Sequence, residues 1–275
     1  MSVITRILPK RRLSRWIGHF MHWEGPTWWT RLSVRTFAWM YKIDLAEAEH
    51  PYTSYKSIGD FFVRRLKPGL RPVAESWAVH PADSVITQSG PMDKGTLVQA
   101  KGINYYLQEF TQDPDWQRKW VGGYFMTYYL CPTDYHRVHS PVEGKITNVR
   151  YMPGHLWPVN EWSTRNVRNL FTVNERVLVE IETDLGPVGV MFVGATNVGY
   201  ISLHFDSQIK GNQKGPHIFL HKNYTPAIPV KKGDELGMFR MGSTVVMLYP
   251  PLFRQRFEKD LSLGPAVRVN GALIV

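Results

Sequence analysis

The sequence predicts an α+β fold, in which a mostly antiparallel β-sheet body follows a group of N-terminal helices. Up to about residue 70, apolar side chains recur at intervals of three and four residues, which is the spacing of amphipathic helices. From about Val79, short runs of β-branched and aromatic residues alternate with Gly, Pro, Asn and Asp. Helices followed by strands are typical of α+β proteins. We therefore divide the chain into a helical region, 1–70, and a β-rich domain, 71–275.

Three helices are predicted in the helical region. The first runs from about Lys10 to Trp23, and its apolar residues are Leu13, Trp16, Ile17, Phe20 and Met21. The second follows the break at Gly25–Pro26, and its apolar residues are Trp28, Trp29, Leu32, Val34, Phe37 and Met40. The third is short, and its apolar residues are Ile58, Phe61, Phe62 and Leu66. Basic helices with Trp and Phe on one side can lie on anionic lipid, which makes them membrane-facing, or can pack on the protein's own body. Both readings remain open at this point.

Seven strands are predicted in the β-rich domain. They are Thr96–Ala100, Tyr124–Leu130, Lys145–Tyr151, Arg176–Ile181, Val188–Val193, Val198–Phe205 and Thr244–Tyr249. The stretch Asp206–Asp234 is polar and rich in Gly, Lys and Pro. We interpret it as a long loop with a short strand around His217–His221, and loops of that length are usually functional.

The amino-acid composition indicates which kinds of molecule the protein can bind. The 275 residues carry 33 Lys and Arg against 23 Asp and Glu, a formal charge of +10, which attracts polyanions such as nucleic acid or an anionic bilayer. Ten tryptophans favour the bilayer, because Trp prefers the boundary between water and lipid. No nucleic-acid-binding motif is found, so we expect no nucleic-acid partner. No apolar run reaches the ~18 residues of a membrane span. No clean apolar run follows the N-terminal charges either, so we expect no cleaved signal peptide.

Cysteine usage excludes further kinds of site. The only cysteine is Cys131, which rules out an internal disulfide framework and a zinc site built from several cysteines. His136 and His139 are three residues apart and could bind a metal, but no clear third ligand stands at a familiar spacing. A metal site is therefore the weaker interpretation, and a hydrogen-bonded pair of histidines at a strand end is the simplest one. We therefore expect no metal.

Three short segments contain the side chains of nucleophilic catalysis: His80–Ser84, Asp134–Pro141 and Gly233–Val245. Asp83, His139 and Ser243 could form a triad, in which the imidazole takes the serine proton and the carboxylate stabilises the imidazolium. Spacing alone does not show that the three residues meet.

The pair Gly242–Ser243 has a second chemical possibility. Glycine leaves its carbonyl open to approach, and the hydroxyl of the following serine can attack that carbonyl to give an ester in place of the amide. Gly-Ser is otherwise a common turn, so the pair alone is a weak signal.

Taken together, the three segments resemble the phosphatidylserine decarboxylase family of the membrane-associated bacterial and mitochondrial type. The Asp-Tyr-His-Arg-Val-His block of that family is matched without change by residues 134–139. Its Gly-Ser-Thr cleavage motif is matched at 242–244, with Met241 in place of the usual leucine. Its Pro-Ala-Asp-Gly segment is matched at 81–84, with Ser84 in place of glycine. If glycine serves a positive φ there, Ser84 would strain the backbone and slow processing. Shorter similarities extend the resemblance over roughly Val79 to Pro250.

The resemblance implies a proenzyme that cleaves itself. His139, oriented by Asp83, would deprotonate Ser243, which would attack the carbonyl of Gly242. The products would be a β chain, residues 1–242, and an α chain, residues 243–275, whose first residue becomes a pyruvoyl group. This self-made cofactor would replace pyridoxal phosphate, form a Schiff base with the serine headgroup and accept the electrons released with CO2. His136 is the candidate acid that protonates the resulting carbanion.

The resemblance also implies partners and a location. The substrate would be phosphatidylserine and the product phosphatidylethanolamine, with residues 71–275 as the catalytic domain. The β and α chains would remain together as a heterodimer, and two such heterodimers would form a homodimer. The protein would lie peripherally on the cytoplasmic side of the cell membrane. Two alternatives remain open: a pyruvoyl-dependent decarboxylase of a soluble amino acid, and an unprocessed lipid-binding scaffold.

Overall fold

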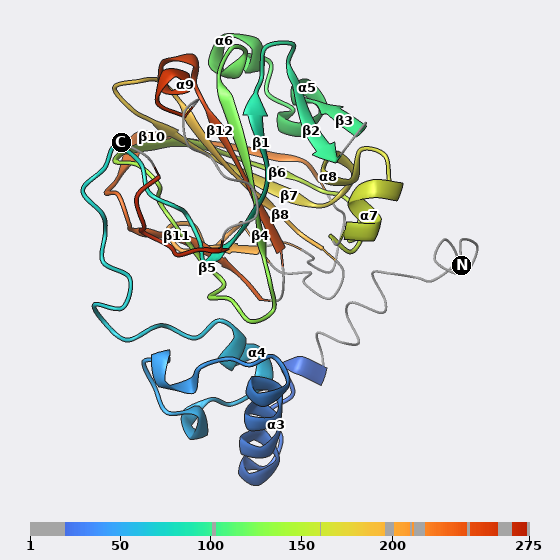
Figure 1. The fold of residues 1–275 in the computed structure, drawn as a ribbon, viewed down its shortest axis with the longest axis vertical. Helices are drawn as coiled ribbons and strands as arrows, with labels where there is room; N and C mark the ends of the chain where they lie inside the picture. The colour runs from blue at the N-terminus through green and yellow to red at the C-terminus, as the bar shows by residue number, and fades with distance from the viewer. Residues whose placement is uncertain are drawn as a thin grey trace.

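A large antiparallel sheet forms the centre of the computed structural model, which describes residues 20–100, 103–159, 161–195, 201–209, 211, 218–240, 243–257 and 266–273 (Figure 1). Its strands lie in the order β10 (Leu220–Val230), β6 (Gly144–Met152), β7 (Arg176–Glu182), β8 (Val188–Val193), β12 (Ser243–Tyr249), β4 (Tyr124–Leu130), β1 (Ser84–Pro91) and β13 (Ala266–Val267). The predicted α+β class with a mostly antiparallel body is confirmed.

Two smaller sheets accompany the large one. The first has the order β5 (Arg137–His139), β11 (Glu235–Phe239) and β9 (Ile201–Leu203). The second pairs β2 (Thr96–Ala100) with β3 (Ile103–Tyr106). The short helices of the β-rich part are α5 (Leu107–Thr111), α6 (Trp116–Trp120), α7 (Glu161–Asn166), α8 (Leu170–Val173) and α9 (Pro251–Phe257).

The middle of the large sheet is buried on both faces. Every residue of β8 is buried, and so are the six residues of β12 from Thr244 onward. This explains why both strands are almost continuous apolar runs without polar alternation. Strand β12 pairs with β8 on one side and with β4 on the other, so that Val246 lies opposite both Met191 and Thr127. The segment that begins at Ser243 is therefore held at the centre of the hydrophobic core.

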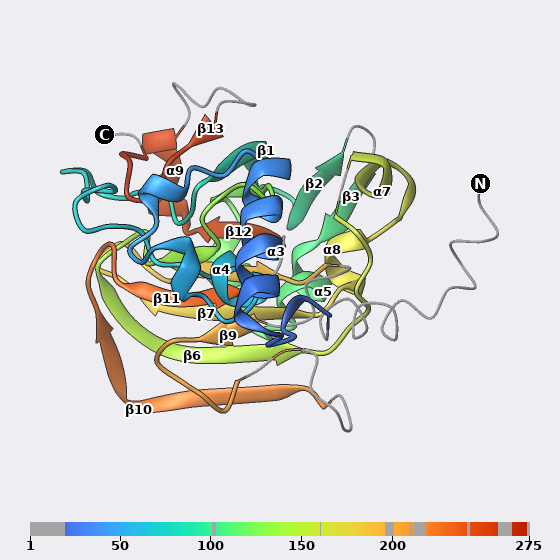
Figure 2. The same cartoon turned by 90° about the horizontal axis from the view of Figure 1, so that it is seen from below.

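The helical region packs as a separate layer at one end of the sheets (Figures 1 and 2). It contains α3 (Thr27–Met40), α4 (Ile58–Phe62) and the 3₁₀ turns Leu45–Glu47 and Tyr52–Ser54. Ser57 caps α4 by accepting a hydrogen bond from the backbone N–H of Asp60 at 3.1 Å. Val34 and Phe37 of α3 share one apolar cluster with Phe61 and Phe62. In the part of the chain that the structure describes, no helix is both long and apolar enough to cross a membrane.

The predicted helices and strands agree with the structure to different degrees. The second helix is confirmed as α3, whereas α4 is shorter than expected and ends before Leu66. The predicted helix at Lys10–Trp23 lies almost wholly outside the described residues. The strands predicted at Thr96–Ala100, Tyr124–Leu130 and Val188–Val193 are confirmed with the same bounds.

The interpretation of Asp206–Asp234 as a long loop is wrong, because β10 occupies Leu220–Val230 and pairs with β6. This strand lies at the edge of the large sheet and is mostly exposed, so it shows no apolar alternation. An edge strand also tolerates Pro226 and Pro229, because one side of its backbone needs no partner. The signals that we took for a loop are those of an edge strand.

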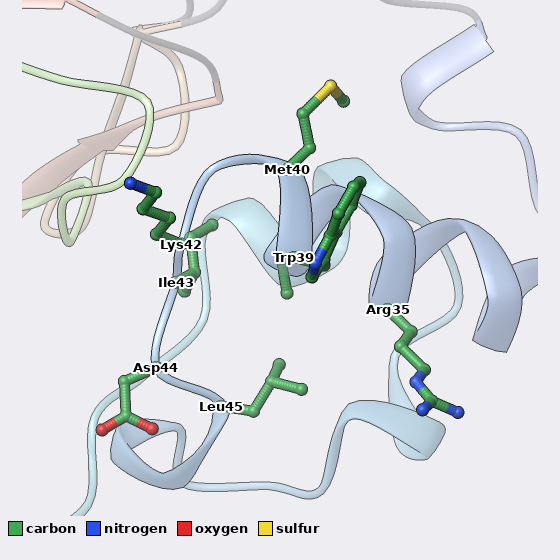
Figure 3. A pocket seen from close by; sticks show the side chains of 8 residues that line it. Arg35, Trp39, Met40, Lys42, Ile43, Asp44 and Leu45 are labelled. Carbon is green, nitrogen blue, oxygen red and sulfur yellow. The ribbon is translucent and has the colours of Figure 1, made fainter.

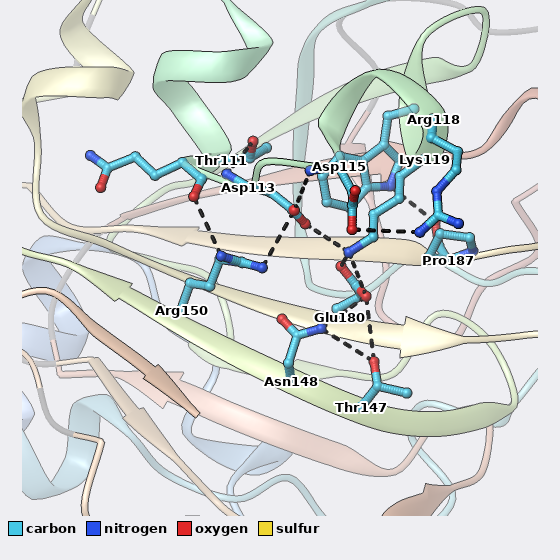
Figure 4. A network of polar contacts seen from close by, with 12 residues as sticks. Thr111, Asp113, Asp115, Arg118, Lys119, Thr147, Asn148, Arg150, Glu180 and Pro187 are labelled. Atoms are coloured by element: carbon cyan, nitrogen blue, oxygen red, sulfur yellow. Dashed lines mark hydrogen bonds and ion pairs between the residues drawn. The ribbon is translucent and has the colours of Figure 1, made fainter. Parts of the chain in front are cut away.

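A buried ionic network joins α6 to the sheet (Figure 4). The Lys119 ammonium donates to Asp113 at 2.7 Å and to Glu180 of β7 at 2.7 Å. Glu180 also accepts from the Asn148 amide at 2.9 Å, and Arg150 lies 3.4 Å from Asp113. Burial raises the pKa of the Asp113 carboxyl, but the hydrogen bonds from Lys119 and the Asp115 backbone outweigh this, and the net pKa is lowered.

Replacing Lys119 with methionine is expected to lower the free energy of unfolding by about 3 kcal/mol, because Glu180 and Asp113 both lose this cation, although Arg150 still lies 3.4 Å from Asp113. Chemical denaturation of purified protein at pH 7 measures this change. Arg118→Met is the matched control, since Arg118 lies on the same helix and pairs with Asp115 at the surface. Equal effects of the two substitutions would contradict a stabilising role for the network.

Candidate active site

The start of β12 defines the site. Ser243 opens this strand, and its partner across the sheet is Leu130, the last residue of β4. The turn at residues 131–136 therefore leaves the sheet beside Ser243. Asp134 closes the turn, because one of its carboxylate oxygens accepts from the backbone N–H of Cys131 at 2.7 Å. Met241, Gly242 and the Ser243 side chain lie outside the described residues.

His136 is the last residue of this turn and is fully buried. Its Nδ1 lies 2.9 Å from the carbonyl oxygen of Asp134, which can only accept, so Nδ1 carries the proton and donates. Nε2 then holds a lone pair, and no group of the described residues forms a hydrogen bond with it. The ring lies 4.0 Å from the ring of Phe62, measured between centroids. Burial lowers the pKa of His136 to about 3, assisted by the positive charge of Arg64, so that the imidazole is neutral at pH 7.

His139 is the last residue of β5, and both its backbone N–H and its two ring nitrogens form hydrogen bonds. Its backbone N–H donates to the carbonyl of Pro81 at 2.8 Å, which places it next to the segment that contains Asp83. Nδ1 donates to the carbonyl of Gly233 at 2.6 Å, and Nε2 accepts from the hydroxyl of Tyr135 at 3.1 Å. Burial lowers the pKa of His139. The residue is therefore a neutral imidazole whose lone pair is directed at Tyr135.

Asp83 is buried and binds arginines rather than the histidine. Its carboxylate accepts from Arg71 at 2.7 Å, from Arg268 at 3.0 Å and from the backbone N–H of Val269 at 2.8 Å. No hydrogen bond joins Asp83 to His139, both of which are described residues. The negative charge of Asp83 nevertheless acts on His139, where it opposes the lowering of the pKa. The structure thus brings the two segments together, and the Gly233 carbonyl, rather than the Asp83 carboxylate, accepts the hydrogen bond from Nδ1 of His139.

Ser84 adopts its place without the strain that a positive φ would cause. It begins β1 opposite Val267 and is not among the described residues with positive φ. Its hydroxyl donates to the carbonyl of Ala82 at 3.1 Å. The substitution of serine for glycine is therefore compatible with the backbone that positions Asp83.

Several residues of the site were missed in the sequence. Arg71 and Arg268 hold Asp83, the Gly233 carbonyl holds His139, and Arg64 donates to the carbonyl of Thr133 in the turn before His136. Tyr135 and Gly233 stand inside segments that the sequence had singled out, but neither was assigned a role. Among the described residues, no group of three or more His, Cys, Asp and Glu side chains is placed to hold a metal ion.

Comparison with known proteins relates this site to one family. The family model described as phosphatidylserine decarboxylase matches residues 58–275. A protein of Anaeromyxobacter sp. (strain K), named phosphatidylserine decarboxylase proenzyme, is 44% identical over 271 residues, which are 98% of this chain and 95% of that protein. Proteins of the same name from Myxococcus xanthus (strain DK1622) and Shewanella putrefaciens (strain CN-32 / ATCC BAA-453) are each 41% identical and cover 97% of this chain. The matches cover 95% and 94% of those two proteins.

Proposed function

The chain belongs to the phosphatidylserine decarboxylase family, and we propose that it is a self-processing carboxy-lyase that converts phosphatidylserine to phosphatidylethanolamine and CO2. The observation that carries this proposal is the 44% identity over 98% of the chain to a protein named as the proenzyme of that activity. The arrangement of residues 134–139 beside the start of β12 supports it, because this block lies next to the expected cleavage site.

Self-cleavage is assigned to His139 and Ser243. The neutral imidazole of His139 can accept the serine proton once the Tyr135 hydroxyl turns away from Nε2. The freed oxygen attacks the carbonyl of Gly242, and the peptide nitrogen of Ser243 leaves that carbonyl, which gives an ester. β-Elimination of the ester releases the Gly242 carboxylate at the end of chain 1–242 and leaves dehydroalanine at the start of chain 243–275. Tautomerisation and hydrolysis by water then release ammonia and leave the pyruvoyl group. The two chains stay together because β12 lies between β8 and β4, and because Arg268 of the α chain binds Asp83 of the β chain.

The cofactor of the reaction is proposed to be a pyruvoyl group made from Ser243. Such a group supplies an electron sink for the carbon that loses CO2. The residues present fit it, since the Nε2 atom of His136 is buried beside the turn that borders Ser243 and has no hydrogen-bond partner among the described residues. No metal or pyridoxal phosphate is required by this chemistry.

The role proposed for His136 is to move one proton. Because Nε2 carries a lone pair and the imidazole is neutral, His136 cannot donate a proton from Nε2 before it has received one. The ammonium group of the serine headgroup must lose a proton before its nitrogen can react. Nε2 takes this proton and returns it to the substrate carbon after CO2 has left. His136 would thus act first as a base and then as the acid.

Replacing His136 with glutamine is expected to slow decarboxylation by about 10²- to 10⁴-fold while self-cleavage proceeds. The two chains are quantified on a denaturing gel, and phosphatidylethanolamine formation is measured on the same sample. The control is His155→Gln, because His155 is exposed and lies outside the site. Full activity of fully cleaved His136→Gln protein would contradict the proton-transfer role.

Membrane attachment is assigned to one face of α3, which lies away from the sheets (Figure 1). Trp28, Leu32 and Trp39 are 66%, 53% and 80% exposed, and their spacing puts them on one side of the helix. A groove beside the end of α3 is lined by Trp39, by apolar residues, by the cations Arg35 and Lys42, and by Asp44 (Figure 3). Exposed Trp beside basic residues is suited to anionic lipid. The cytoplasmic side and the homodimer remain predictions.

The double substitution Trp28→Ser and Trp39→Ser is expected to weaken binding to vesicles that contain phosphatidylserine by at least about tenfold, because two large apolar surfaces are lost. Vesicle co-sedimentation measures this affinity. Trp162→Ser is the matched control, since Trp162 is 52% exposed but lies on α7. Unchanged binding of the double variant would show that this face of α3 does not attach the protein to the membrane.

A direct experiment tests the function. The purified protein is expected to show two masses, of chains 1–242 and 243–275, and to release CO2 from phosphatidylserine but not from free serine. CO2 release from the free amino acid alone would favour the soluble-substrate alternative. A single uncut, inactive chain that still binds vesicles would favour the lipid-binding scaffold.

A further inference from the structure

Arg64 is a buried cation with unused donors. The side chain follows α4 and is 4% exposed. Nη2 donates to the carbonyl of Thr133 at 3.3 Å, whereas Nε and Nη1 have no hydrogen-bond partner in the part of the chain that the structure describes. The guanidinium also lies 5.1 Å from the centre of the Phe61 ring. Buried charges are normally paired, because an unpaired one loses its hydration without compensation.

Acidic residues near Arg64 do not supply the missing partner. Glu47 and Asp83 both bind Arg71, at 3.0 Å and 2.7 Å, and Asp83 also binds Arg268. Asp134 accepts from the backbone of its own turn. No ion pair joins Arg64 to a carboxylate in the part of the chain that the structure describes. The guanidinium stays charged even though burial lowers its pKa, because arginine does not deprotonate in proteins.

Arg64 lies beside the turn that borders the active site. Thr133, which accepts from Arg64, belongs to the turn between Leu130 and His136, and Leu130 is the partner of Ser243. The charge of Arg64 is close enough to His136 to contribute to its lowered pKa. Nε2 of His136 is a third buried atom there without a hydrogen-bond partner among the described residues. The same turn thus has two neighbours: the Arg64 guanidinium with its unused N–H groups, and the lone pair on Nε2 of His136.

We propose that Arg64 is a specificity-determining residue that binds the phosphodiester group of the substrate through Nε and Nη1. This proposal rests on the proposed function and names the part of the substrate that the site recognises. The planar fork of an arginine matches two oxygens of a phosphate. The phosphodiester keeps its negative charge through the whole reaction, so binding it stabilises the substrate and the transition state alike.

The substrate carboxylate is the less suitable partner for Arg64. The carboxylate loses its negative charge as CO2 forms. An arginine bound to it would therefore stabilise the reactant more than the transition state and would slow the reaction. An arginine that binds the phosphate instead changes KM and leaves kcat almost unaltered. This difference makes the two assignments separable by experiment.

The first experiment uses cleaved Arg64→Gln protein with two soluble substrates, glycerophosphoserine and O-acetylserine, of which only the former carries a phosphate. We expect KM for glycerophosphoserine to rise by about 10- to 100-fold with kcat nearly unchanged. The parameters for O-acetylserine are expected to stay those of the unsubstituted protein, and Arg64→Lys is expected to recover part of the loss. Arg65→Gln is the matched control, because Arg65 is the next residue and is exposed. Equal losses on both substrates, or no loss, overturn the proposal.

A second experiment needs neither cleavage nor a folded Arg64 variant. The uncut Ser243→Ala chain is titrated calorimetrically with glycerophosphoserine, O-acetylserine and inorganic phosphate. At least tenfold tighter binding of glycerophosphoserine than of O-acetylserine is expected, and competition by inorganic phosphate shows that the phosphate is what is recognised. Equal affinities for the two serine compounds overturn the proposal. If the proposed function itself is wrong, the unsubstituted protein releases no CO2 from phosphatidylserine, which is a separate result from any change at Arg64.

Discussion

Replacing Ser243 with alanine is expected to leave the protein as one 275-residue chain with no detectable decarboxylation of phosphatidylserine. The substitution removes the only atom that we assign to attack on the Gly242 carbonyl, and it removes the source of the cofactor. Because β12 is held between β8 and β4 by main-chain hydrogen bonds, the loss of one hydroxyl at its first position leaves the sheet intact. Intact mass of the denatured protein measures the first effect, and CO2 release measures the second.

The matched control for this prediction is Ser202→Ala. Ser202 lies in β9, and its buried hydroxyl has no hydrogen-bond partner among the described residues, so its removal costs little and touches no step of the reaction. This variant is expected to yield both chains and normal activity. Cleavage of the Ser243→Ala protein between residues 242 and 243 would mean that another group attacks that bond.

The sequence predicted the centre of the fold better than its edges. Strands β4 and β8 were found with their correct bounds, because both are buried on two faces and therefore consist almost entirely of apolar and aromatic residues. Strand β10 was missed, because an exposed edge strand is selected neither for apolarity nor for alternation. Strand β5 is only three residues long and is too short to show a period. Strands β4 and β8 could thus be recognised in the sequence because they are buried, whereas β10 is long but exposed and was missed.

The same distinction holds for the site. The block at residues 134–139 could be found because its side chains are contiguous, and the structure places both of its histidines in the site. The partners of Asp83 could not be found, because Arg268 is 185 residues away and only the pairing of β13 with β1 brings it close. The acceptor for His139 was also invisible, since Gly233 contributes a main-chain carbonyl and no side-chain chemistry. Sequence patterns identify reactive side chains, while the groups that hold them are set by topology.

Replacing His139 with alanine is expected to slow self-cleavage by about 10²- to 10⁴-fold, because Ser243 loses its base. The rate is measured by following the appearance of the α chain after synthesis of the precursor in a cell-free system. His155→Ala, at an exposed position, is the control and is expected to process normally. A His139→Ala precursor that matures at the control rate would exclude His139 as the base.

The pH dependence of self-cleavage tests the same assignment without a substitution. A base works in its neutral form, so the rate should be constant above the pKa of His139 and fall as the imidazole becomes protonated below it. Burial lowers this pKa from the ordinary value of 6.5, which extends the constant region toward acid. The midpoint of the acid limb is therefore expected below pH 6.5. The Gly233 carbonyl and the charge of Asp83 both oppose the lowering, so Asp83→Asn should move the midpoint further toward acid. A midpoint that moves toward alkali in Asp83→Asn would show that the carboxylate does not act on His139 through its charge.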